Sequence, residues 1–168
     1  MPKSNAVLLK VSGIFGVLAP VFAFAFIFLA IASYPQFSWT NNALSDLGVV
    51  LGATSSFFNS GLIFSGIWCL FFAIGLFMFL GESMLGRVGV FFFVLTCLAL
   101  VAIGVFPENV KPAHYIVSVL FFVLLPISLL IITEAFWLMG KVRMAVFTLL
   151  VAIVAAVPWV LYYSIRYV

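Results

Sequence analysis

Few side chains in this 168-residue chain can take part in acid–base or metal chemistry, since it has four carboxylates, one histidine and two cysteines. Five polar residues stand beside or between long apolar runs: Ser45, Asp46, Asn59, Glu108 and His114. Polar and ionisable groups next to apolar surroundings are costly and commonly functional. These five residues are therefore the candidates for a binding or catalytic site.

The elements that must position these residues are long apolar segments. Hydrophobic residues make up 67% of the sequence and charged residues only 7%, which excludes a water-soluble globule. A membrane-spanning helix needs roughly 20 apolar residues. We therefore predict an all-α, polytopic transmembrane helical bundle that forms a single domain over residues 1–168. Its five predicted spans are residues 11–33, 56–80, 88–106, 112–138 and 145–165.

The distribution of Lys and Arg predicts the orientation of this bundle. Two cations, Lys111 and Arg166, fall on one side, and five fall on the other: Lys3, Lys10, Arg87, Lys141 and Arg143. Cytoplasmic loops carry the excess of positive charge, so we expect a multi-pass protein of the cell membrane with a cytoplasmic N-terminus and an external C-terminus. Nucleic acid is not expected as a partner, because scattered cations form no basic track.

The connection between the first two spans, residues 34–55, is longer than a turn requires. We expect it to contain a short helix at the outer membrane boundary, with Ser45 and Asp46 in its first turns. Ser, Thr, Asn and Asp side chains commonly cap helix starts. Three residues could serve as that cap: Thr40, Asn41 or Asn42.

The predicted topology brings Asn59, Glu108 and His114 to the same outer side as Asp46. We expect Asp46 and His114 to approach one another there, directly or through a third group, because unsatisfied polar groups beside lipid are costly. Two interpretations remain open. The cluster could be an ion, proton or headgroup site, or it could be a hydrogen-bonded clasp that holds the loop on the bundle.

Two further expectations concern the packing and the inner side. Helices in membranes associate through small residues, and in the second span such residues recur every four positions: Gly61, Ser65, Cys69 and Ala73. The first span has Gly13 and Gly16 at its start. At the inner boundary, Glu134 is expected to form an ion pair with Lys141 or Arg143.

Several short motifs follow one another in the order found in a known family: Asn42-Ala-Leu-Ser-Asp-Leu-Gly48, Phe58-Asn59-Ser-Gly-Leu62 with Gly66, Gly104-Val-Phe-Pro-Glu108, and His114. In these motifs the chain resembles the largely archaeal membrane family catalogued as domain of unknown function 998, which is distantly similar to the Frag/DRAM/Sfk group. The resemblance implies that the recurrent polar positions of the family are Ser45, Asp46, Asn59, Glu108 and His114. Members usually have six spans, so the resemblance leaves room for a second copy or a partner helix to complete the bundle.

Three functions remain open on the sequence alone. We favour a lipid-binding or scaffold role, with membrane lipids as partners and the outer cluster meeting a headgroup. An intramembrane hydrolase acting on a lipid headgroup is the enzymatic alternative, with Asp46, Glu108 and His114 as its chemical groups. A small ion or proton transporter is disfavoured, because the middle of each span has few polar residues to form a path. The residues indicate no cofactor and no resident metal.

Overall fold

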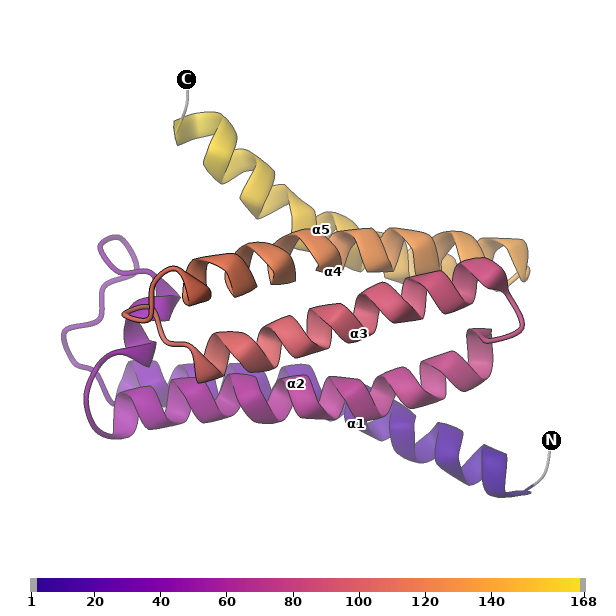
Figure 1. Ribbon diagram of the computed structural model, residues 1–168, viewed down its shortest axis with the longest axis horizontal. Helices are drawn as coiled ribbons and strands as arrows, with labels where there is room; N and C mark the ends of the chain where they lie inside the picture. Colours follow the sequence, from indigo (N-terminus) through magenta and orange to yellow (C-terminus); the bar gives the residue numbers. More distant parts are fainter. Residues whose placement is uncertain (1–2, 167–168) are drawn as a thin grey trace.

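The computed structural model describes residues 3–166, and in that range it is built from helices and their connections (Figure 1). Five long helices run back and forth: α1 (Lys3–Ala32), α2 (Ala53–Leu80), α3 (Met84–Val105), α4 (Ala113–Leu138) and α5 (Val142–Arg166). A short 3₁₀ helix, η1 (Leu44–Gly48), lies between α1 and α2. All five long helices contain a stretch long and apolar enough to cross a membrane. The predicted all-α bundle with five spans is confirmed.

The helix starts differ more from the sequence prediction than the helix ends do. The first helix begins at Lys3, eight residues before the predicted residue 11, and α2, α3 and α5 each begin three or four residues early. The prediction was based on apolar runs, whereas a helix continues through polar residues after it leaves the hydrocarbon. Two prolines, Pro20 and Pro126, lie within unbroken α1 and α4.

The long helices pack in the order of the chain. Extensive contacts join α1 to α2, α2 to α3, α3 to α4 and α4 to α5. Figure 1 shows the first turns of α1 and the last turns of α5 pointing away from the rest of the bundle. The arrangement is therefore an open row, in which α1 and α5 each have one extensively packed helical neighbour among the described residues.

The antiparallel arrangement gives the bundle two unlike ends (Figure 1). The loop end carries residues 33–52, with η1, and residues 106–112; the turn end carries the short turns at residues 81–83 and 139–141. Most of the described cations lie toward the turn end: Lys10, Arg87, Lys141 and Arg143. The side chains of Lys3 and Arg166, and the terminal residues 1–2 and 167–168, lie outside the described part of the chain.

Small residues occupy the seams of α2, as their spacing predicted. Gly61, Ser65 and Ala73 are buried, and a Cβ atom at Gly61 would lie only 2.5 Å from Cβ of Phe26 in α1. Gly13 does not fit the prediction for the first span, since apart from its chain neighbours and the adjacent backbone of α1 no atom lies within 4 Å of the position its Cβ would take. Gly13 is thus on a face of α1 that no other part of the described chain covers.

Candidate functional site at the loop end

The start of η1 is stabilised by the carboxylate of Asp46. Its Oδ2 atom accepts hydrogen bonds from the Asn42 side-chain amide at 3.1 Å and from the Ala43 backbone amide at 3.0 Å. The short helix predicted here is confirmed, but its predicted cap is wrong, because the N-cap residue is Ala43 rather than Thr40, Asn41 or Asn42. The reason is that Asp46, three residues into the turn, reaches back to the free amide, as the second half of a capping box does.

Asn59 of α2 holds the other end of η1. Its side-chain Nδ2 donates a hydrogen bond to the Gly48 carbonyl at 3.0 Å. The approach is close enough to require glycine, since a Cβ atom at Gly48 would lie 2.8 Å from Asn59 Oδ1 and 3.2 Å from the Phe58 ring. The preceding residue, Leu47, is fully buried in an apolar cluster with Phe58 and Ala30. The loop is therefore docked on the bundle by one buried side chain and one side-chain hydrogen bond.

A second connection at the same end joins the residue that follows α1 to α2. The hydroxyl groups of Ser33 and Thr54 are 2.8 Å apart and share a hydrogen bond, and Thr54 also donates to the Ser33 carbonyl. Thr54 is buried, with 3% of its surface exposed. The sequence interpretation missed this pair. Its only signal was the position of two hydroxyl residues at facing ends of consecutive helices.

His114 and Glu108 belong to the connection between α3 and α4. The His114 Nδ1 atom lies 2.7 Å from the Phe106 carbonyl oxygen. A carbonyl only accepts, so Nδ1 carries the proton of this bond. The Glu108 Oε2 atom is buried and has no hydrogen-bond partner in the described structure. The histidine thus fastens its own loop, whereas the carboxylate is left without a donor.

The five candidates therefore share one end of the bundle without forming one network. In residues 3–166, no hydrogen bond or ion pair joins Asp46 directly to His114. The alternative that we expected, an approach through a third group, stays a prediction. Ser45 is half-buried and makes no side-chain hydrogen bond in that range. Asn59 resembles Glu108 in one respect, because its Oδ1 atom is also buried without a donor.

The described residues contain no group of three His, Cys, Asp or Glu side chains that could hold one metal ion. At the loop end the carboxylates and the imidazole lie in separate hydrogen-bond arrangements. This end contains two buried hydrogen-bond acceptors without donors, Asn59 Oδ1 and Glu108 Oε2. Each acceptor is suited to a ligand that carries hydrogen-bond donors.

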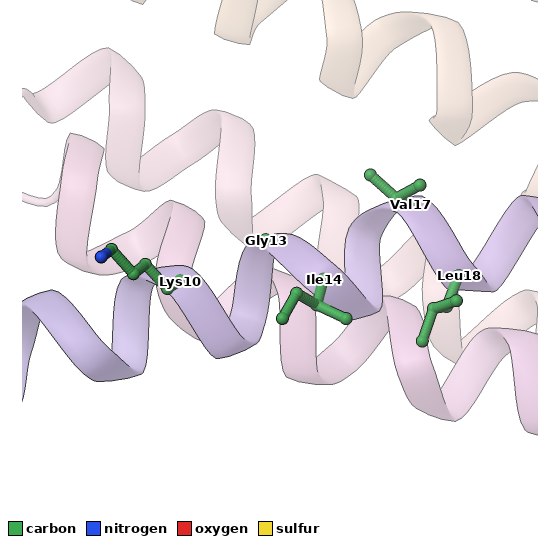
Figure 2. Close-up of a pocket in the computed structure, with 5 residues that line it drawn as sticks. All are labelled: Lys10, Gly13, Ile14, Val17 and Leu18. Atoms are coloured by element: carbon green, nitrogen blue, oxygen red, sulfur yellow. The ribbon is translucent and has the colours of Figure 1, made fainter.

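A shallow hollow lies elsewhere, on the exposed flank of α1 (Figure 2). It is lined by residues of that helix alone: Lys10, Gly13, Ile14, Val17 and Leu18. Figure 2 shows these five residues in succession along α1. Because no second element shapes this hollow, it offers no arrangement of polar groups.

Five spans in an open row, with a docked loop at one end, define a multi-pass helical membrane protein. A family model described as protein of unknown function (DUF998) matches residues 17–166, which include the second half of α1 and all of α2 to α5. The chain belongs to this family. No curated protein and no solved structure matches the chain.

Proposed function

We propose that the protein is a lipid-binding protein of the cell membrane, and that its loop end receives a headgroup bearing ammonium or hydroxyl donors. The observation that carries this proposal is the pair of buried acceptors without donors, Asn59 Oδ1 and Glu108 Oε2. A buried polar atom left without a partner costs about 1–3 kcal/mol. A headgroup that donates hydrogen bonds to both atoms would remove that cost.

Exposed apolar side chains around the loop end support contact with lipid. Leu51 is 95% exposed and Trp39 is 68% exposed. Tryptophan is enriched at the depth of the headgroups, where one part of its ring is apolar and its N–H group remains wet. These two residues would therefore bring the acceptor pair to the boundary at which headgroups are found.

The distribution of charge supports an outward orientation of the loop end. Lys10, Arg87, Lys141 and Arg143 lie toward the turn end, and Lys111 is the cation of the loop end among the described side chains. Cytoplasmic segments carry the excess of Lys and Arg. In this proposal the turn end and the N-terminus are cytoplasmic, and the lipid comes from the outer leaflet.

The test is the lipid that remains bound to the protein after purification in a mild detergent, identified by mass spectrometry. The informative variant is Glu108→Met, which removes the acceptor and keeps a side chain of similar length. The matched control is Glu82→Met, because Glu82 is an exposed carboxylate at the turn end. A hydrogen bond to a charged group contributes about 1.5–3 kcal/mol, so Glu108→Met should reduce retention about tenfold or more, and Glu82→Met should not.

Equal retention of the same lipid by both variants would contradict the proposal. A stoichiometric divalent metal that copurifies with the protein and is lost in Glu108→Met, with no lipid retained, would also contradict it. That second result would favour the alternative of an intramembrane hydrolase.

A further inference from the structure

A cavity of about 380 Å³ lies toward the turn end, between α2, α3, α4 and α5. This volume falls within the roughly 300–1,000 Å³ that small-molecule sites occupy. Each of the four helices contributes one phenylalanine to the wall: Phe72, Phe93, Phe136 and Phe147. The cavity is separate from the acceptor pair of the loop end, and neither Asn59 nor Glu108 lines it.

Two of the residues that line the cavity carry polar side chains, Arg143 and Thr148. The Thr148 hydroxyl already donates to the Met144 carbonyl of its own helix at 2.8 Å. Arg143 is therefore the group that can meet a polar part of a ligand. One cation at the edge of an apolar wall fits an amphiphile with a single anionic end.

The charge of Arg143 is not compensated within the described chain. The ion pair that we expected between Glu134 and Lys141 or Arg143 is not formed there. The first turn of α5 contains no acidic residue, and Lys141 immediately precedes the helix. The N-terminus of a helix carries a partial positive charge, which repels cations and stabilises an anion. The local charge thus favours an anionic occupant.

The length of the cavity corresponds to one leaflet of a bilayer. Its lining residues on α5 extend from Arg143 to Val151. Eight residues of helix rise about 12 Å, and half of a hydrocarbon core is about 15 Å. An acyl chain placed along this wall would have its charged end at Arg143.

The single cation at one end of an apolar wall favours a lipid chain over a partner helix. An acyl chain is narrow and flexible, so it can follow the wall from Val151 to Arg143 and place an anionic group there.

We infer that this cavity binds one acyl chain of an anionic phospholipid from the leaflet at the turn end, with the phosphate at Arg143. This inference goes beyond the proposed function, because it concerns another end of the bundle and a headgroup that accepts hydrogen bonds instead of donating them. Phosphatidylglycerol and phosphatidylcholine are suitable probes. Both carry a phosphate, but only the first has a net negative charge.

The experiment measures binding of the two lipids by native mass spectrometry, in protein first stripped of lipid by detergent exchange. The wild-type chain should bind phosphatidylglycerol about tenfold more tightly than phosphatidylcholine, and Arg143→Gln should abolish the preference. Arg87→Gln is the matched control, since Arg87 is an exposed cation of the turn end that does not line the cavity. It should keep the preference. Val151→Trp fills the cavity and should weaken the binding of both lipids.

Equal losses in Arg143→Gln and Arg87→Gln would overturn the inference, because they would show attraction to the whole basic end rather than to the cavity. A dimer that forms with the cavity covered and excludes both lipids would overturn it as well. Circular dichroism of each variant confirms that the helices remain intact. The hydroxyl groups of phosphatidylglycerol could also donate to the acceptors of the loop end, and Glu108→Met removes that contribution. Glu108→Met should therefore keep the preference for phosphatidylglycerol over phosphatidylcholine that Arg143→Gln loses, so this inference and the proposed function can fail independently.

Discussion

Replacing Asn59 should show how firmly the loop end is held on the bundle. The Asn59 amide donates to the Gly48 carbonyl at 3.0 Å, while its own Oδ1 atom is buried without a donor. In Asn59→Leu the carbonyl loses its donor, but the unpartnered Oδ1 atom is removed as well. The two desolvation costs, each about 1–3 kcal/mol, largely cancel, and the net loss is the bond itself, about 0.5–1.5 kcal/mol.

The Asp side chain in Asn59→Asp has almost the shape of the wild-type Asn, but this variant should be less stable than Asn59→Leu. It places a carboxylate oxygen against the Gly48 carbonyl, so that two acceptors face each other, and it adds a buried charge with no partner. An uncompensated buried charge costs about 3 kcal/mol or more. The expected order of stability is therefore wild type, then Asn59→Leu, then Asn59→Asp.

The free energy of unfolding in detergent gives this order, and limited proteolysis of residues 33–52 reports release of the loop. Ser60→Ala is the control, because the Ser60 hydroxyl bonds only to carbonyls of its own helix. It should change stability by less than about 0.5 kcal/mol. If Asn59→Asp proves as stable as Asn59→Leu, the assignment of Asn59 as a donor to Gly48 is wrong.

Three further predictions concern a buried hydroxyl, the polar cluster and the topology. Ser65 is buried with no partner for its hydroxyl, so Ser65→Ala should leave the melting temperature unchanged or raise it, and a clear drop would reveal a hidden partner. Asp46→Asn and His114→Gln should have additive effects on the free energy of unfolding, because the two residues belong to separate hydrogen-bond networks. The double variant should agree with the sum of the single variants within about 0.5 kcal/mol. A larger coupling energy would mean that the two side chains meet. On a cysteine-free background, an impermeant thiol reagent added outside should label Trp39→Cys and not Met84→Cys, positions that are 68% and 75% exposed; the reverse pattern would invert the proposed orientation.

The fold class could be predicted from the sequence, because a long continuous apolar run that crosses a membrane must form a helix to satisfy its backbone hydrogen bonds. The shared location of Asp46, Asn59, Glu108 and His114 also followed, since each lies near a predicted span end on the same side. Their hydrogen-bond partners could not be predicted from the sequence. Position along a span gives depth in the membrane, but it does not show which local donor or acceptor is nearest. Asp46 found its donors within four residues, and the imidazole of His114 found a carbonyl eight residues away.

The cavity toward the turn end was beyond sequence reasoning for a different reason. It lies between four helices, and each supplies a single phenylalanine to the wall. The spacing of residues within one helix cannot predict a cavity between four helices. The sequence did contain one usable signal, which was Arg143 at the start of a span with Lys141 as its charged neighbour and no carboxylate close in sequence.

The packing of the helices in chain order has a consequence for biosynthesis. In residues 3–166, extensive contacts join only consecutive helices. Since helices in membranes associate after insertion, each helix meets its partner as soon as the next one enters the bilayer. Contacts close in sequence also form fast. The bond between Asn59 and Gly48 needs only the loop and α2, whereas the cavity needs α2 to α5. Residues 33–52 can therefore dock on the bundle early during translation, and the cavity forms only once α5 has inserted.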